Sequence, residues 1–553
     1  MFRATPKDRQ LNLLSSTHTF LSGASLNAYE DPNGWHNLFR EQITDRIDEE
    51  PFRPLFCQDN GAPNTSIRVL VSMMILKEAR SLSDSELIEE CRFNLLTRSA
   101  LGLFNMDDPL TAMSTYYLLR SRIVIWNKSG NENLIEKVFS QVTKSQVIEF
   151  KINGKKIRLD SKLMGSNIAW YSRYELIHES VRKAYSCIKK EFNSLLLSDS
   201  DIQLLESICK ESGDKVSYRS NRTEIESRLR ALGKVIYKII QEYGHYACES
   251  IEILCRVFNE QYVVKEEDIT PRSKEEIQAD SVQSPHDTDC HYRSKGDNEV
   301  KGYSVNVTET CDTDAPLNLI TNVLVEPASA ADCHFLQPAI EATQEIVIEN
   351  TETVNADGAY HSVDNQDYCK EKGIDLILGA IQGKPSRYDL SYNENGELII
   401  TNLQTNTIIP SRRVTSRKKQ KHPKWAIKDE QGKNRYFTQK EIDTCLLRKQ
   451  IVERSQTELN VRNNVEATIF QLGYHYPNAK SRYRGLIKHK IWANLRCLWI
   501  NFVRIKNFIV RNRVNYAQKS LKSSFFTHFL SNIVKILFIV CVVKNNRFVL
   551  QKK

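Results

Sequence analysis

The sequence contains no Cys-x-x-Cys pair, although it has 13 cysteines, and it has no uninterrupted apolar run long enough to cross a membrane. Scattered cysteines of this kind predict reduced thiols in the cytoplasm rather than a zinc site or a disulfide framework. The C-terminal apolar stretch, residues 525–543, is interrupted by His528 and Lys535, and its unbroken part covers only residues 536–543. We therefore expect a packing helix or a buried strand there, and no membrane partner.

Glycine and proline are also scarce, with 20 and 15 residues among 553, and no internal repeat is visible. The first residues lack the apolar core of a signal peptide. Hydrophobic residues make up 41% and charged residues 26% of the chain, which excludes a collagen-like or mostly disordered protein. A chain of this length is expected to form several domains.

Positive charge is unevenly distributed along the chain. Residues 411–553 contain 32 lysines and arginines against seven acidic residues, a net charge of +25, so the rest carries −16 within a total of +9. Between residues 411 and 440 the basic residues are interleaved with Trp425, Tyr436 and Phe437. A basic segment joined to an acidic body predicts a polyanionic partner, with nucleic acid as the first candidate.

Residues 1 to about 130 have a helical pattern. Apolar residues from Ile67 to Ile75 recur at helical spacing, and Ser83 with Glu86 forms the signature of a capping box that opens a second helix. Two helices joined by a short turn could read DNA, but the pattern alone favours an ordinary helical hairpin.

A β-hairpin is predicted at residues 147–161. Residues 147–152 and 155–161 both alternate between apolar and polar side chains. Asn153-Gly154 lies between them, and this dipeptide is typical of a tight hairpin turn. The second predicted strand ends at Asp160.

The pattern after this hairpin predicts a mixed α/β sheet interrupted by insertions. Residues 172–270 are helical and residues 265–300 read as a polar loop, while Asn395-Gly396 marks a further hairpin. A helix is expected around residues 333–345. The predicted strands are residues 302–307, 317–325, 352–360 and 374–379.

Three acidic residues stand out by their context. Asp160 and Asp357 each end a predicted strand, and Glu466 lies in a predicted helix. They are far apart in the sequence, so only the fold could bring them together. Two strand-end carboxylates and one helix carboxylate can bind two hard divalent cations through oxygen. Two such cations can activate water and stabilise the leaving oxygen at a phosphodiester.

The order of these motifs resembles the bacterial insertion-sequence transposases of the DDE class. The resemblance implies a ribonuclease-H-like mixed α/β sheet with an N-terminal helical domain and helical and β insertions. In the N-terminal region it is carried by Phe56, Gly61-Ala62-Pro63 and residues 70–77, 82–87 and 98–103. In the core it is carried by residues 158–162, 301–303 and 356–360, by Arg462-x-x-x-Glu466 and by residues 482–485.

The resemblance and the composition together give the expected domain boundaries. We expect a helical DNA-binding domain at residues 1–135 and a catalytic core formed by residues 145–171 and 300–510. A helical insertion with a polar loop would occupy residues 172–299, and a β-hairpin with a basic insertion residues 380–440. Residues 511–553 would form a basic and apolar tail.

The resemblance also implies roles for individual residues. Asp160, Asp357 and Glu466 would be the catalytic triad and the ligands of Mg²⁺ or Mn²⁺, and Arg462 would contact a DNA phosphate. Many relatives carry tyrosine and lysine where this chain has Leu459 and Gly473. The other residues expected to bind DNA are Lys480, Arg482, Arg484, Arg412, Arg413, Arg417, Lys418 and Lys419.

The function implied by the resemblance is DNA transposition, in which the enzyme cuts at the ends of an insertion sequence and joins them to target DNA. Its expected partners are double-stranded DNA, as terminal inverted repeats and as target, and a second copy of the chain. The expected location is the cytoplasm, in association with the nucleoid. Two alternatives stay open: a decayed transposase that only binds DNA, and a metal-dependent DNA nuclease.

Overall fold

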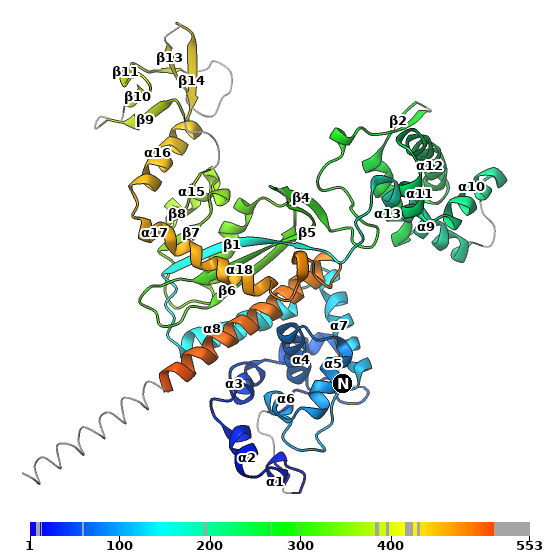
Figure 1. Ribbon diagram of the computed structural model, residues 1–553, viewed down its shortest axis with the longest axis vertical. Coiled ribbons are helices and arrows are strands. Elements are labelled where there is room, and N and C mark those ends of the chain that lie inside the picture. Colours follow the sequence, from blue (N-terminus) through cyan, green and yellow to red (C-terminus); the bar gives the residue numbers. More distant parts are fainter. Residues whose placement is uncertain are drawn as a thin grey trace, which may run out of the picture.

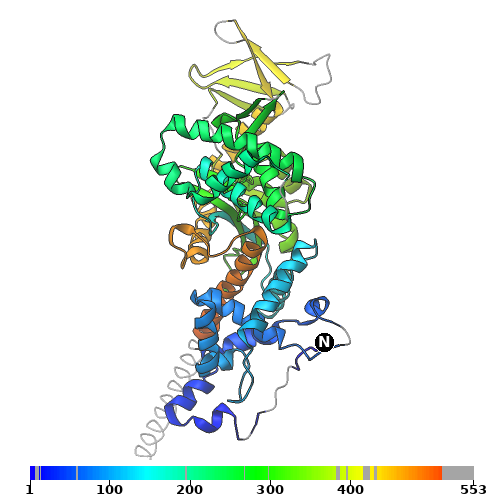
Figure 2. The same ribbon diagram turned by 90° about the vertical axis from the view of Figure 1, so that its right-hand side faces the viewer.

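The computed structural model describes residues 1–513, apart from residues 7–10, 13, 58–59, 193–195, 267, 297, 382–385, 394–396, 415–423 and 429–431. A central sheet carries three outlying parts, which are the N-terminal helices, a helical arm and a small β unit (Figure 1). After a 90° turn the β unit and the N-terminal helices still lie at opposite ends of the molecule (Figure 2). Within the described part of the chain, no helix has both the length and the apolar character needed to cross a membrane. The apolar stretch at residues 525–543 lies outside the described residues.

The N-terminal region is helical, as predicted. Its second predicted helix begins with the expected capping box, in which Ser83 Oγ accepts from Glu86 N and the Glu86 carboxylate accepts from Ser83 N. The helix before it, α4, is buried from Ile67 to Ala79 and so cannot enter a DNA groove, which makes the pair an ordinary helical hairpin. The helices are α1 (Thr17–Phe20), α2 (Gly23–Glu30), α3 (Trp35–Gln42), α4 (Ile67–Arg80), α5 (Asp84–Phe93), α6 (Leu95–Ala100), α7 (Met113–Lys128) and α8 (Leu134–Glu149).

The hairpin predicted at residues 147–161 is wrong in its first half, because residues 147–149 end helix α8. Thr143 and Val147 are both fully buried, four residues apart on one helix face. Over six residues, this spacing can be mistaken for strand alternation. Asn153-Gly154 instead joins α8 to the first strand of the sheet. Gly154 has φ = +79°, and a Cβ there would lie 2.5 Å from Val347 Cβ, so glycine is required.

The central sheet is built around β1 (Lys156–Gly165). This strand pairs antiparallel with β5 (Asn298–Thr310) and parallel with β7 (Thr353–Ala356). The order is β4–β5–β1–β7–β8, and β6 also pairs with β5. This mixed sheet with flanking helices confirms the predicted fold class. The remaining elements of the core are β4 (His291–Lys295), β6 (Ile320–Pro327), β8 (Asp375–Leu378), α14 (Leu336–Gln344) and α15 (Val363–Glu371).

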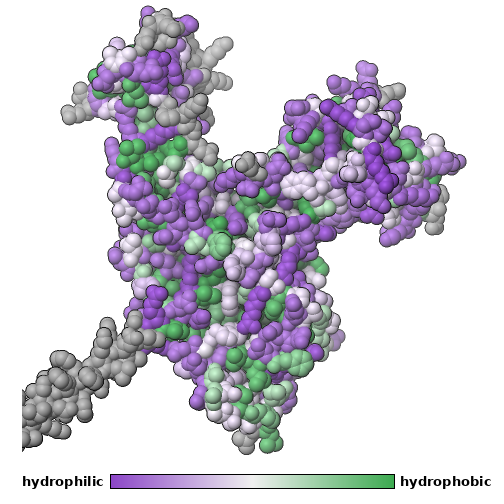
Figure 3. Space-filling model, in the orientation of Figure 1, coloured by the Kyte–Doolittle hydropathy of each residue, from purple (hydrophilic) through white to green (hydrophobic). Residues whose placement is uncertain are grey.

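Between β1 and β5 the chain forms the helical arm, which has an apolar core of its own. The face of the arm seen in Figure 3 is mostly hydrophilic. The polar loop predicted at residues 265–300 is corrected, because β3, β4 and the start of β5 fall within it. The arm contains α9 (Arg173–Glu191), α10 (Asp199–Lys210), α11 (Gly213–Arg219), α12 (Arg222–Tyr243), α13 (Glu249–Gln261), β2 (Tyr262–Lys265) and β3 (Asp268–Pro271).

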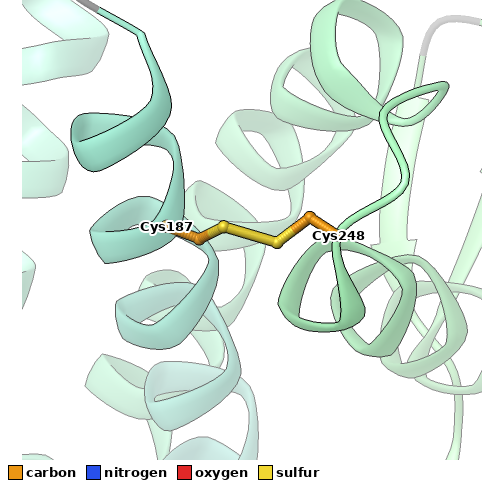
Figure 4. Close-up of a disulfide and its surroundings, with 2 residues drawn as sticks. All are labelled: Cys187 and Cys248. Carbon is orange, nitrogen blue, oxygen red and sulfur yellow. A yellow bond between two sulfur atoms is a disulfide. The ribbon is translucent and has the colours of Figure 1, made fainter. Parts of the chain in front are cut away.

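A disulfide joins Cys187 of α9 to Cys248, the residue before α13 (Figure 4). The expectation that all cysteines are reduced is therefore wrong for this pair. The other ten cysteines in the described part of the chain are free thiols.

The β unit follows β8 and consists of two three-stranded sheets that share one apolar core. The predicted hairpin flanking Asn395-Gly396 is present, because β9 and β10 pair antiparallel, although the turn itself lies outside the described residues. The strands are β9 (Tyr388–Tyr392), β10 (Leu398–Asn402), β11 (Thr407–Ile409), β12 (Arg412–Val414), β13 (Lys424–Lys428) and β14 (Asn434–Thr438).

The chain returns to the sheet through helices. The first, α16 (Gln439–Glu453), leads out of the β unit and was not predicted. Beyond residue 455 the chain is helical as predicted, with α17 (Gln456–Asn460), a 3₁₀ turn (Val461–Asn464) and α18 (Val465–Gly473). A long helix over residues 486–513, called here the C-terminal helix, packs against both the sheet and the N-terminal helices.

One buried carboxylate connects the sheet to these last helices. Glu309 of β5 is completely buried, and its Oε1 accepts a hydrogen bond from Arg158 Nε of β1 at 2.6 Å. Its Oε2 accepts from Thr468 Oγ1 of α18 and from Arg504 Nη2 of the C-terminal helix, both at 2.7 Å. Burial alone would raise the pKa of Glu309, but Arg504 and Arg158 hold that pKa below its ordinary value.

We predict that Glu309→Ala lowers the free energy of unfolding by about 3–5 kcal/mol, because Arg158 and Arg504 would lose their buried counter-ion. Urea unfolding followed by circular dichroism measures this change. Glu299, an exposed residue of the same strand, is the matched control. Glu299→Ala should change the free energy by less than about 0.5 kcal/mol. Equal effects of the two substitutions would contradict the assignment.

The contribution of Glu309 should also depend on pH. A carboxylate with a depressed folded pKa stabilises the protein above its unfolded pKa of about 4.3, and this stabilisation is lost as the pH falls through the folded pKa. The stability difference between the wild type and Glu309→Gln should therefore be largest at neutral pH and shrink below about pH 4.3. A difference that stays constant over this range would show that the ionised carboxylate is not the stabilising group.

Candidate active site

Asp160 lies in the middle of β1 rather than at its end, because the strand continues to Gly165. The parallel pairing with β7 stops earlier, at Arg158 opposite Asn355, so Asp160 is just beyond the paired region. Its Oδ1 accepts a hydrogen bond from Ser161 N at 2.8 Å. Burial raises the pKa of Asp160, and the neighbouring Arg462 acts in the opposite direction.

Asp357 directly follows β7 and begins a 3₁₀ turn (Gly358–Tyr360). Its Oδ1 accepts from Gly358 N at 2.6 Å, which orients the carboxylate. A Cβ at position 358 would lie 1.7 Å from the carbonyl oxygen of Ala380, so only glycine fits there. Because β1 and β7 are parallel neighbours, Asp160 and Asp357 reach the same edge of the sheet.

The guanidinium of Arg462 faces both carboxylates. Its Nη2 is 3.8 Å from Asp160 Oδ2, and its Nη1 is 3.5 Å from Asp357 Oδ1. Arg158 fixes the turn that carries this arginine, because Arg158 Nη1 donates to the carbonyl oxygen of Val461 at 2.9 Å. The Nε–H of Arg462 is buried and has no acceptor among the described residues. Two carboxylates around one guanidinium leave a net negative charge at this edge of the sheet.

Glu466 is not brought into this arrangement. It lies exposed in the first turn of α18, whereas the exposed fractions of the Asp160 and Asp357 side chains are 17% and 36%. Over the residues that the structure describes, no three carboxylate, histidine or cysteine side chains gather closely enough to hold a metal ion. The structure thus brings together two members of the predicted triad and leaves the third apart.

The basic motif at residues 480–484 is engaged inside the molecule. Lys480 Nζ donates to the carbonyl oxygen of Ile168 at 2.8 Å, and Arg484 Nε donates to that of Asn167 at 2.6 Å. Arg482 donates to the carbonyl oxygen of Leu82 at 2.7 Å, between α4 and α5. These three side chains connect the last part of the chain to the base of the helical arm and to the N-terminal helices.

Of the other predicted DNA-binding residues, Arg412 and Arg413 are exposed on β12 of the β unit. Arg417, Lys418 and Lys419 lie outside the described residues.

The sequence analysis did not identify Glu309 or its role. Asn306, Thr308 and Glu309 are fully buried in β5, a strand whose sequence gives no sign of which polar residues have partners. An acidic residue among β-branched neighbours is only a weak signal for a buried ion pair. Its arginine partners, Arg158 and Arg504, are distant in the sequence, so the local pattern does not identify them.

Comparisons with known proteins identify two regions of the chain. Residues 28–122 match a family model described as a transposase domain, DUF772, and residues 276–502 match one described as a transposase DDE domain. Together the two regions cover more than half of the chain. Asp357 and Glu466 lie inside the second region, and Asp160 lies before it.

Among solved structures, the chain is similar to the piggyBac transposase synaptic complex with hairpin DNA. The identity is 10% and the TM-score 0.25, over 87% of this chain and 76% of that one. No curated protein matches the chain. The assignment rests on the two family models and on the mixed sheet described above: the chain belongs to the insertion-sequence transposases of the DDE class, with a ribonuclease-H-like core.

Proposed function

We propose that the chain cuts DNA at the ends of an insertion sequence and joins the freed ends to target DNA, using Asp160 and Asp357 to hold Mg²⁺ or Mn²⁺. The observation that carries this proposal is the pair of carboxylates that face one guanidinium at the edge of β1 and β7. Hard divalent cations prefer carboxylate oxygens, and both side chains are partly exposed. We also assign Glu466 to the site as its third carboxylate, because its helix packs on β1, although its side chain lies apart from the two aspartates in this structure.

The side chains of this site have separable roles. Ser161 N and Gly358 N hold the two aspartates in fixed orientations, so little reorganisation is needed when a substrate arrives. Arg462 balances their charge and is close enough to exchange a carboxylate for a DNA phosphate. Divalent cations, when bound, supply an activated water and stabilise the leaving oxygen of the phosphodiester.

We assign DNA binding outside the site to one face of the β12–β14 sheet. Directly paired residues share a face, and Arg412, Ala426 and Tyr436 form one such row. Lys424 and Lys428 belong to the same face by alternation, whereas Trp425 and Phe437 on the opposite face pack in the apolar core. A basic face with an exposed tyrosine suits the phosphate backbone.

Two ends of an element must be held together before they are joined, so we propose that the active form is a homodimer. Double-stranded DNA is the partner, both as the terminal inverted repeats and as the target. Association with the nucleoid follows from these contacts.

We predict that Asp160→Asn and Asp357→Asn each reduce Mg²⁺-dependent cleavage of element-end DNA at least about a thousandfold, equivalent to about 4 kcal/mol in the barrier. Glu466→Gln should act in the same direction. The substrate is a duplex taken from the flanks of the gene that encodes the chain. Asp367→Asn, an exposed carboxylate of α15, is the control and should cleave like the wild type. Cleavage that survives both aspartate substitutions would refute the proposal, and cleavage without joining would identify a nuclease.

Arg462→Gln should strengthen Mn²⁺ binding in the absence of DNA. The guanidinium repels a cation held by Asp160 and Asp357, and its removal relieves a repulsion on the order of 1–1.5 kcal/mol, or about tenfold in the dissociation constant. Isothermal titration calorimetry measures the constant. Unchanged or weaker binding would show that the two aspartates do not hold the cation.

The basic face of β12–β14 predicts a salt effect. Replacing Arg412 and Lys428 with glutamine should reduce the slope of log affinity for duplex DNA against log salt by about 1.8, because each phosphate contact contributes about 0.9. Lys215→Gln in α11, another exposed lysine, is the control and should leave the slope unchanged. Equal slopes for the double variant and the wild type would show that this face of the β12–β14 sheet does not bind DNA.

A further inference from the structure

A lysine on β1 lies on the same face as the candidate site. Side chains alternate along a strand, so Arg158, Asp160 and Lys162 share one face of β1. Met164, the next residue on this face, is fully buried in the core that also contains Leu472 of α18. The Lys162 side chain therefore lies where α18 covers this face of the strand.

The end of α18 is shaped around this lysine. A Cβ added at Gly473 would lie 2.7 Å from Lys162 Cε and 2.8 Å from its Nζ. Any other residue at position 473 would have to displace the ammonium group. The glycine thus allows the ammonium to lie against the backbone of the helix that carries Glu466.

Lys162 differs from the two arginines of this region because it lacks a counter-ion. Arg158 is paired with Glu309, and Arg462 faces Asp160 and Asp357. Lys162 Nζ forms no hydrogen bond or ion pair with any described residue, although the residue is only partly exposed. A partly buried ammonium without a partner favours the binding of an anion from outside.

We propose that Lys162 binds a phosphate of the DNA strand held at Asp160 and Asp357, and that Gly473 preserves the space this contact needs. The inference rests on the proposed function. Lys162 acts as a positioning residue, since two residues along a strand span about 6.6 Å and the lysine therefore contacts a phosphate beside the reacting one. For a site between β1 and α18, next to the two aspartates, the available anion is a phosphate of the bound DNA.

The first test compares Lys162→Gln with Lys156→Gln, an exposed lysine at the start of the same strand. Binding of the element-end duplex is measured over a range of salt concentrations without divalent cations. Lys162→Gln should bind about tenfold more weakly and lower the salt slope by about 0.9, the value for one phosphate. Lys156→Gln should match the wild type in both.

The second test locates the contact. Duplexes with a single neutral methylphosphonate are scanned through the phosphates next to the cleavage site. At one position, neutralising the phosphate should cost the wild type about tenfold in affinity. The same duplex should bind Lys162→Gln as tightly as the unmodified duplex does, because this variant has no ammonium group to interact with that phosphate. A purely structural lysine would show no such position, which would overturn the inference.

Gly473→Ala supplies a variant that leaves every charge in place. Its methyl group would push the Lys162 ammonium aside, so its binding should resemble that of Lys162→Gln, and the double variant should show no further loss. Additive losses would refute the role given to Gly473. If the wild type cleaves element ends while Lys162→Gln binds and cleaves equally well, the inference fails and the proposed function stands. If the wild type does not cleave, the proposed function itself fails.

Discussion

The arrangement of the candidate active site depends on Glu309, a completely buried carboxylate between two arginines. Arg158 and Arg504 neutralise it from opposite sides, and Thr468 fills another acceptor position. A buried charge of this kind is tolerated only when its partners are fully formed. Those partners come from β1, α18 and the C-terminal helix, so none of the three can shift without exposing a charge to an apolar interior.

Arg158 connects the buried ion pair of Glu309 to the candidate active site. One side of its guanidinium binds Glu309, and Nη1 holds the carbonyl oxygen of Val461, the residue before Arg462. The position of Arg462 between the two aspartates is thereby linked to a residue outside the site. The same network fixes α18, the helix that carries Glu466, through Thr468. The strand with Asp160 and the turn with Arg462 thus share one support.

Much of this could be predicted from the sequence, because the signals were local. The capping box at Ser83 and the strand-end motif around Asp357 depend on a few neighbouring residues, and both are present. The hairpin predicted at residues 147–161 was wrong in its first half, because a window of six residues is too short to distinguish strand alternation from one face of a helix. Helix α8 begins at Leu134 and continues through Val147 to Glu149. Tertiary context decided which period applied.

The site was predictable only in part for a different reason. The approach of Asp160 and Asp357 follows from the parallel pairing of β1 and β7, whereas the position of Glu466 depends on how α18 packs. Glu309 could not be found from one sequence, because its partners are about 150 and 200 residues away. Ion pairs between residues that are distant in the sequence produce no recurring pattern in it.

The charge asymmetry of the chain also acquires a more specific meaning. Part of the net +25 in residues 411–553 serves inside the molecule, because Arg482, Arg496 and Arg504 bind carbonyl oxygens or Glu309. The net charge of this segment therefore overstates the positive charge that is free to contact DNA. The helical arm adds no net positive charge, since residues 172–290 hold 17 basic against 22 acidic residues.

In the described structure, other positive charges stand clear of such internal use, and we propose DNA contacts for two groups of them. One is the exposed basic face of the β12–β14 sheet, and the other is Lys162, two residues along β1 from Asp160. The first lies in the separate β unit, whereas β1, which carries Lys162, belongs to the central sheet (Figure 1). A DNA strand that met both would be held at two distant points, with the reacting phosphate near the inner one. On the roles proposed for them, the β12–β14 face would contribute to overall affinity and Lys162 would set the register of the strand at the site.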